Sequence, residues 1–170
     1  LRNVIIDCQG GVGRYSLKLI GVSNFTVEYS QIYQRNFGKM ILIDDSDGLV
    51  VQNNEGIGGS AQIYIDGTVD LLAERNYFHD RSFQNVTSPP NDHHESIQIG
   101  SGSFADGEAT FNNNNFSPDS PSFNPNTLTD FAFVTGDTNI TLNLTSNYIQ
   151  KQQWFGVRCG GTSECNLVTN

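Results

Sequence analysis

The sequence predicts an all-β fold, a right-handed parallel β-helix whose coils hold about 22 residues each and carry loop insertions. The first observation is a strand-like segment ending in or near Asn or Gln, which recurs at residues 26–32, 49–54, 71–77, 110–116 and 142–148. The starts of these segments lie 23, 22, 39 and 32 residues apart. The two shorter intervals fit one coil each, and the two longer ones fit coils with inserted loops.

The second observation is another set of strand-like segments ending in Gly or Asp, at residues 19–21, 41–44, 63–66, 97–100 and 157–160. Their residues alternate as in strands with one buried face. We expect Ile43, Ile65 and Ile99 to stack in one inward ladder, with Tyr64 and Gln98 in an outward column. Helical periodicity and the hairpin dipeptide Asn-Gly are absent from the sequence, which argues against helical repeats and antiparallel sandwiches.

A polar residue marks one turn of successive coils, at Gln31, Asn54, Asn76, Asn115 and Asn147. Asn tolerates turn conformations of the backbone, and its amide both donates and accepts hydrogen bonds. We therefore expect these side chains to stack and to satisfy buried backbone groups, which is a structural role.

We expect residues 1–170 to form a single β-helix domain that is a fragment of a longer β-helix protein. The chain opens on a strand and stops inside another, and a solenoid without end caps exposes apolar edges. No apolar run is long enough to span a membrane, so we expect no membrane insertion. Residues 79–94 and 117–130 are rich in Ser, Pro, Asn and Asp, which predicts projecting loops that wall a groove.

The charge is strongly acidic, with a formal net charge of −9. No Lys or Arg occurs between Arg81 and Lys151, whereas several Asp and Glu residues do. Nucleic acids and anionic membranes require a basic surface, so we expect neither as a partner. A polyanionic sugar is disfavoured for the same reason, unless a metal ion supplies positive charge.

The cysteines and glycosylation sequons favour a secreted, extracellular protein. Cys159 and Cys165 are close enough in sequence to form a disulfide, although two unpaired thiols are the alternative and Cys8 is left over. Sequons occur at Asn24, Asn85, Asn115, Asn139 and Asn143, and a chain so rich in Asn, Ser and Thr produces some by chance.

Three stretches, 75–81, 91–101 and 111–116, are similar to family 6 polysaccharide lyases, which include alginate lyases and chondroitinase B. The similarity covers roughly residues 71–116 and weakens toward residue 160. It implies β-elimination on a uronic-acid polysaccharide. In that reaction Ca²⁺ neutralises the sugar carboxylate, a Lys removes the adjacent proton, and an Arg assists.

The resemblance carries only part of this site over to the chain. Arg158 matches the assisting Arg, Asn91 matches an Asn ligand beside Glu95, and Asp130 could replace a Glu ligand for Ca²⁺. The strand at 129–136, where the resemblance expects the base, holds no Lys. His93 or His94 could replace this base, or both are solvated loop histidines. The acidic residues could equally be an ordinary loop without metal.

These observations lead to three hypotheses. The first is an extracellular, non-catalytic β-helix module that is structural or glycan-binding, and the missing Lys favours it. Its partners are a polysaccharide or other β-helix segments. Aromatic residues such as Tyr64, Tyr77 and Trp154 could be exposed and stack on sugars, or several of them are core residues. The second hypothesis is an active polysaccharide lyase with a rearranged base. The third is the shaft of a tailspike-like adhesin.

Overall fold

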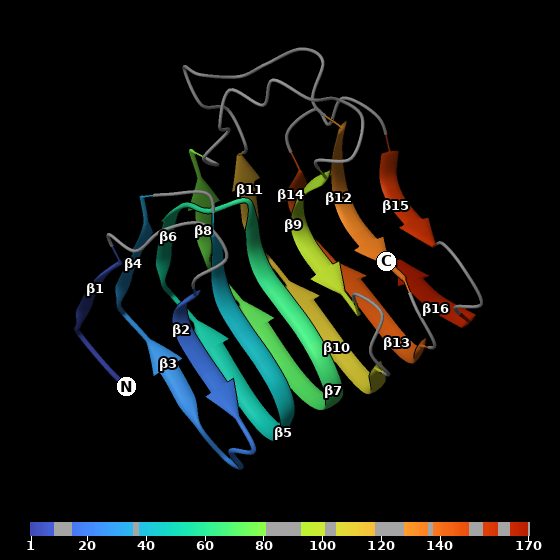
Figure 1. Ribbon diagram of the computed structural model, residues 1–170, viewed down its shortest axis with the longest axis horizontal. Helices are drawn as coiled ribbons and strands as arrows, with labels where there is room; N and C mark the ends of the chain where they lie inside the picture. The colour runs from blue at the N-terminus through green and yellow to red at the C-terminus, as the bar shows by residue number, and fades with distance from the viewer. Residues whose placement is uncertain are drawn as a thin grey trace.

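The computed structural model describes residues 1–8, 15–35, 38–80, 93–100, 105–117, 128–135, 138–149, 155–159 and 164–169. In these ranges the chain is all-β, and every strand pairing is parallel. The all-β prediction is therefore confirmed. The described segments contain no helix with the length and hydropathy needed to cross a membrane. Figure 1 shows the strands lying side by side along the long axis of the molecule, with consecutive strands of the sequence often in different sheets.

One sheet has six short strands. In spatial order they are β1 (Ile5–Cys8), β4 (Gln31–Gln34), β6 (Glu55–Gly58), β8 (Tyr77–His79), β11 (Asn115–Ser117) and β14 (Tyr148–Ile149). Its inward row holds the buried apolar residues Ile32, Phe78 and Phe116, with Gly56 between Ile32 and Phe78. Phe78 and Phe116 pair in register, are fully buried, and stack with ring centroids 5.3 Å apart.

The other sheet has ten strands and two halves. The first half-sheet contains β2 (Tyr15–Ile20), the first part of β5 (Lys39–Gln52), the first part of β7 (Ala61–Glu74), β9 (His93–Ile99), β12 (Leu128–Val134) and β15 (Phe155–Cys159). The second half-sheet contains β3 (Thr26–Glu28), the later parts of β5 and β7, β10 (Ala105–Asn112), β13 (Thr138–Thr145) and β16 (Glu164–Thr169). β5 and β7 are long, curved strands that join the halves (Figure 1).

The change of direction within β5 and β7 requires a special backbone. The pairing register shifts between Asp44 and Leu49, and Asp45 has a φ of 43°. Opposite this bend, Gly67 has a φ of 64°, and a Cβ atom there would overlap the Asp45 carboxylate. Glycine is therefore required at this position both for its backbone conformation and for the close approach.

The predicted isoleucine ladder is confirmed. Ile43, Ile65 and Ile99 pair in register on β5, β7 and β9, and all three are fully buried. The ladder continues to Val134 on β12, which is also fully buried. Identical β-branched side chains stacked on neighbouring strands pack closely, so this ladder is the core of the first half-sheet.

The predicted polar ladder exists, but two of its members were assigned wrongly. Its asparagines are Asn54, Asn76, Asn114 and Asn147, which follow one another at intervals of 22, 38 and 33 residues. Asn76, Asn114 and Asn147 each accept two hydrogen bonds at 3.0 Å from the preceding asparagine of the ladder. The backbone N–H of that preceding asparagine donates one, and its Nδ2 donates the other. Asn54 instead accepts a hydrogen bond from the backbone N–H of Ser30, also at 3.0 Å.

The first and fourth predicted members, Gln31 and Asn115, lie one residue beyond the ladder. Both are outward residues of the six-stranded sheet, in β4 and β11. The structure therefore places Ser30 and Asn114 at the turn. Ser30 Oγ accepts a hydrogen bond from the backbone N–H of Val4, which continues the same function with a hydroxyl.

Candidate functional site

The outward residues of the first half-sheet form one row across the strands. The register runs through Lys18, Leu42, Tyr64, Gln98, Phe133 and Arg158. Arg158 thus falls in the row of Gln98 and Tyr64, with Phe133 between Gln98 and Arg158. The side chain of Arg158 lies outside the described part of the chain, so its predicted catalytic role stays a prediction.

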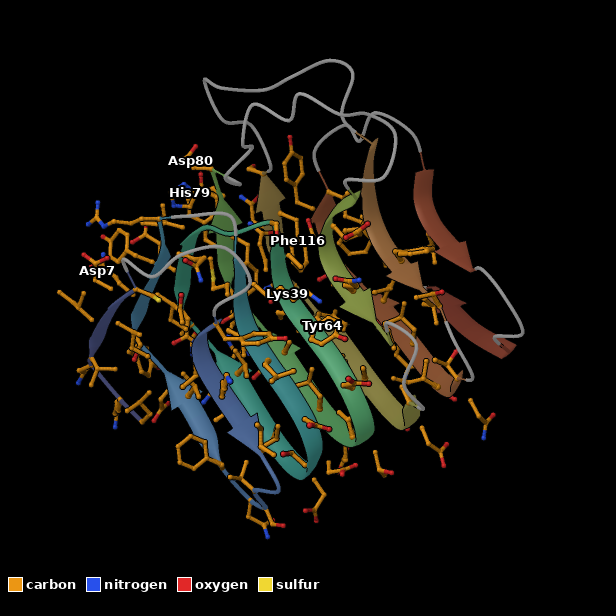
Figure 2. All side chains as sticks on the ribbon, in the orientation of Figure 1. Asp7, Lys39, Tyr64, His79, Asp80 and Phe116 are labelled. Atoms are coloured by element: carbon orange, nitrogen blue, oxygen red, sulfur yellow. The ribbon has the colours of Figure 1, made fainter. Side chains whose placement is uncertain are left out.

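The prediction that Tyr64 is exposed is wrong. Tyr64 is 3% exposed, because Lys39 covers its ring: the Lys39 Nζ lies 3.3 Å from the ring centroid. Tyr15 packs beside Tyr64 with ring centroids 6.3 Å apart, and Lys18 Nζ lies 4.9 Å from the Tyr15 centroid. Two lysines thus sit over two neighbouring tyrosine rings, an arrangement in which ring and ammonium attract each other. Figure 2 shows Lys39 and Tyr64 together on β5 and β7.

We call this surface the Lys39 face, defined by Tyr15, Lys18, Lys39, Tyr64 and Gln98. Lys39 reaches it because strand alternation is interrupted. Met40 and Ile41 are consecutive and both fully buried, and Met40 Sδ lies against Gly56 in the six-stranded sheet. Lys39 therefore turns outward, whereas an alternation extended back from Ile41 and Ile43 would point it inward.

Burial controls the electrostatics of the Lys39 face. Desolvation lowers the pKa of Lys39, and the carboxylates of Glu95 and Asp66 partly oppose this shift. Glu95 is 1% exposed, and the backbone register places it two strands from Lys39, with Ala61 between them. Burial also raises the pKa of Tyr15, with further contributions from Asp66 and Asp44. Lys39 therefore holds its proton less tightly than an ordinary lysine.

The Ca²⁺ ligands implied by the resemblance are only partly described. Glu95 and Asp130 lie directly opposite each other on β9 and β12. Asn91 lies outside the described residues, as does the side chain of Asp130. Glu95 is buried, and its negative charge opposes the lowering of the Lys39 pKa. Its role as a Ca²⁺ ligand stays a prediction. Within the described ranges, no three His, Cys, Asp or Glu side chains are grouped as a metal site.

The candidate histidine bases begin strand β9. His93 and His94 lie opposite Leu128 and Thr129 of β12. Their side chains are not among those that the structure describes, so their role as a base stays a prediction.

The two cysteines of the predicted disulfide lie in different halves of the ten-stranded sheet. Cys159 pairs with Val134 in the first half-sheet, and Cys165 pairs with Ile140 in the second. Neither side chain is described, so the disulfide stays a prediction. Cys8 is a free, half-buried thiol whose Sγ lies 3.8 Å from the backbone oxygen of Tyr15.

The sequon asparagines differ in accessibility. Asn24 and Asn139 are exposed, whereas Asn143 is half-buried in β13. The Asn143 amide donates hydrogen bonds to Glu108 and Thr110, at 2.6 and 3.2 Å. Asn85 lies outside the described residues. Glycosylation at these positions stays a prediction.

The Lys39 face offers ammonium donors held in place by aromatic rings, together with the half-buried amide of Gln98. Such groups bind hydroxyl and carboxylate oxygens, and a neutral Lys39 amine could accept a proton. Trp154, another predicted sugar-stacking residue, lies outside the described residues. Comparison of the chain with family models, curated proteins and solved structures gives no match.

Proposed function

We propose that this chain is part of a right-handed parallel β-helix in an extracellular protein, and that its Lys39 face binds a glycan without cleaving it. The β-helix is supported by all-parallel pairing and by the regular return of the chain to the same turn, at intervals of 22, 38 and 33 residues along the asparagine ladder. In this fold the core is filled by side chains, so outward residues are the ones that bind.

The observation that carries the glycan proposal is the fixed position of Lys39 over Tyr64. A lysine on an open surface must lose side-chain freedom when it binds a ligand, and this loss weakens binding. Lys39 has lost most of that freedom already, because the Tyr64 ring lies beneath its amine at 3.3 Å. Lys18 is exposed nearby, so two donors are available to the oxygens of a sugar chain.

A second candidate function is β-elimination on a uronic-acid polysaccharide, and the lowered pKa of Lys39 favours it. In this reaction the neutral Lys39 amine takes the proton next to the sugar carboxylate. The electron pair of that C–H bond forms a carbon–carbon double bond, and the glycosidic oxygen leaves as an alkoxide that takes a proton from an acid or from water. Lys39 would thereby supply the base that strand β12 lacks.

One experiment separates the two functions. The protein is incubated with alginate, pectate, chondroitin sulfate and xylan, and both binding and the absorbance of the unsaturated product are measured. We expect binding to at least one polysaccharide without product, and loss of this binding in Lys39→Met. Arg2→Met is the matched control, because Arg2 also lies over a tyrosine ring, 5.0 Å from the Tyr29 centroid, away from this face.

Two outcomes contradict the proposal. Absence of binding to all four polysaccharides, or binding that Lys39→Met leaves unchanged, would refute a glycan-binding role for the Lys39 face. Formation of an unsaturated product that disappears in Lys39→Met, but not in Arg2→Met, would replace the binding function with the lyase function.

A further inference from the structure

The outer face of the six-stranded sheet carries a second row of aromatic and polar residues. The register runs through Gln31, Glu55, Tyr77, Asn115 and Tyr148, and we call this surface the Tyr77 face. Tyr77 is 42% exposed and Tyr148 is 61% exposed, in contrast to the buried Tyr64. Asn115 lies between the two tyrosines on β11. Aromatic side chains that are exposed on a flat sheet lose hydration when a ligand covers them, which favours binding.

The Tyr77 ring is held by a chain of contacts across two strands, β8 and β6. It stacks on His79 with centroids 4.3 Å apart and an interplanar angle of 17°. The two ring nitrogens of His79 lie 3.1 Å from Glu55 and 3.0 Å from Asp80. Figure 2 shows His79 and Asp80 together at the end of β8. Since His79 is anchored, Tyr77 presents a pre-oriented ring face, which reduces the entropy lost on binding.

The spacing of the row suits a sugar chain. Neighbouring strands lie roughly 4.8 Å apart, so Tyr77 and Tyr148 are about 10 Å apart across β11. This separation is close to the length of a disaccharide. Asn115 lies at the midpoint, and its Oδ1 accepts a hydrogen bond from Ser117 Oγ at 3.2 Å, which orients the amide. The two tyrosine rings can stack on the ring faces of a sugar chain, and the amide between them can bond its hydroxyl groups.

The charges on the Tyr77 face disfavour an acidic sugar. Glu55 and Asp80 lie beside Tyr77 through their contacts with His79. Among the described side chains, the cation at this face is Arg35. Its guanidinium donates two hydrogen bonds to the carboxylate of Asp7, at 2.7 and 2.8 Å. Within the described part of the chain, a carboxylate or sulfate on the ligand would therefore meet repulsion from Glu55 and Asp80, with no unpaired cation at this face to offset it.

We propose that the Tyr77 face binds a neutral polysaccharide, whose sugar rings stack on Tyr77 and Tyr148. This site is separate from the Lys39 face, because its residues come from the six-stranded sheet and it uses stacking where the Lys39 face uses ammonium groups. The proposal goes beyond the proposed function and does not depend on it.

The test uses protein from a bacterial host, which leaves the Asn115 sequon unmodified. Binding of cellohexaose and xylohexaose is measured by isothermal titration calorimetry for the wild type, Tyr77→Ala, Tyr148→Ala and Tyr148→Phe. Tyr29→Ala is the matched control, because Tyr29 is also exposed, at 50%, but lies in the turn after β3. We expect each alanine variant at the Tyr77 face to weaken binding at least tenfold. Tyr148→Phe keeps the ring and should bind within about twofold of the wild type.

The outcomes for the two faces are distinguishable. Lys39→Met should leave the binding of cellohexaose and xylohexaose unchanged, because Lys39 is not part of the Tyr77 face. This expectation holds whether or not the Lys39 face binds a glycan. Failure of the wild type to bind both oligosaccharides would overturn the proposal. So would equal weakening by Tyr29→Ala and Tyr77→Ala. Circular dichroism melting of each variant verifies that the fold is retained, and Tyr148→Ala at the exposed end of the row remains informative if Tyr77→Ala unfolds.

Discussion

The Lys39 face and the Tyr77 face both present outward tyrosines from consecutive strands, yet they differ in exposure. Tyr64 on β7 is 3% exposed, whereas Tyr77 on β8 is 42% exposed. Both rings contact a nitrogen-bearing side chain, Lys39 in one case and His79 in the other. Lys39 lies over Tyr64 from the neighbouring strand β5, whereas His79 stacks on Tyr77 from the same strand. The direction of a side chain is set by strand alternation, but its exposure is set by the side chains that pack against it.

The largest expected effect concerns the core of the first half-sheet, which lies behind the Lys39 face. Ile65→Asp places a charge in a fully buried position of the isoleucine ladder. An unpaired buried charge is costly, so we expect a loss of about 4 kcal/mol or more of the free energy of unfolding. Urea denaturation followed by circular dichroism measures it. Wild-type stability in this variant would contradict the inward assignment of the ladder.

Truncation of the two tyrosines tests the comparison directly. Tyr64→Ala removes a buried ring, and we expect a loss of about 3–4 kcal/mol of the free energy of unfolding. Tyr77→Ala removes an exposed ring, and the loss should stay near 1 kcal/mol or below. Chemical denaturation of both variants provides the measurement. Equal losses would mean that the difference in exposure between the faces is not real.

Two adjacent asparagines provide a matched pair of smaller effects. Asn114→Ala removes the acceptor for the backbone N–H and the Nδ2 of Asn76, and leaves both donors buried without it. We expect a loss of about 2–3 kcal/mol. Asn115→Ala changes an outward side chain, and we expect an effect within about 0.5 kcal/mol. If the denaturation midpoint shifts more for Asn115→Ala, the corrected position of the ladder is wrong.

The pH dependence of stability provides the smallest expected signal. Burial lowers the pKa of Lys39, whereas a lysine in the unfolded chain titrates near about 10.4. Between these two pKa values the unfolded chain binds more protons, so the free energy of unfolding rises with pH. Lys39→Met should lack this rise. The check is a series of urea midpoints from neutral pH to about pH 9, below the titration of the tyrosines. A constant difference between variant and wild type at every pH would contradict the lowered pKa.

The sequence predicted the isoleucine ladder correctly because three strands repeat the same Ile-x-Ile pattern, and only one face of a strand can bury it. The asparagine ladder was displaced by one residue at two positions. In the repeated segments 71–77 and 110–116, the last residue is large and follows an asparagine. Matching the segments at this end pairs Tyr77 with Phe116. The structure pairs Phe78 with Phe116, since Tyr77 points outward. An exposed tyrosine thus had the sequence signature of a core residue.

Lys39 was not predicted from the sequence, for a related reason. The resemblance directed the search for a base to the strand at 129–136, whereas Lys39 precedes the first isoleucine of β5. Extending the alternation back from Ile41 would have placed it in the core. The consecutive burial of Met40 and Ile41 breaks that alternation, and nothing in a single strand of sequence reveals such a break.

Lysine footprinting tests the central claim, that the Lys39 face binds a glycan, most directly. The chain has three lysines, Lys18, Lys39 and Lys151, and the first two lie on this face. Amine acetylation is followed by peptide mass spectrometry with alginate, pectate, chondroitin sulfate or xylan, and with polyethylene glycol of matched viscosity as the control. We expect at least one polysaccharide to slow the labelling of both Lys18 and Lys39, and polyethylene glycol to slow neither. Labelling of both lysines at the same rate in all five polymers would contradict the account.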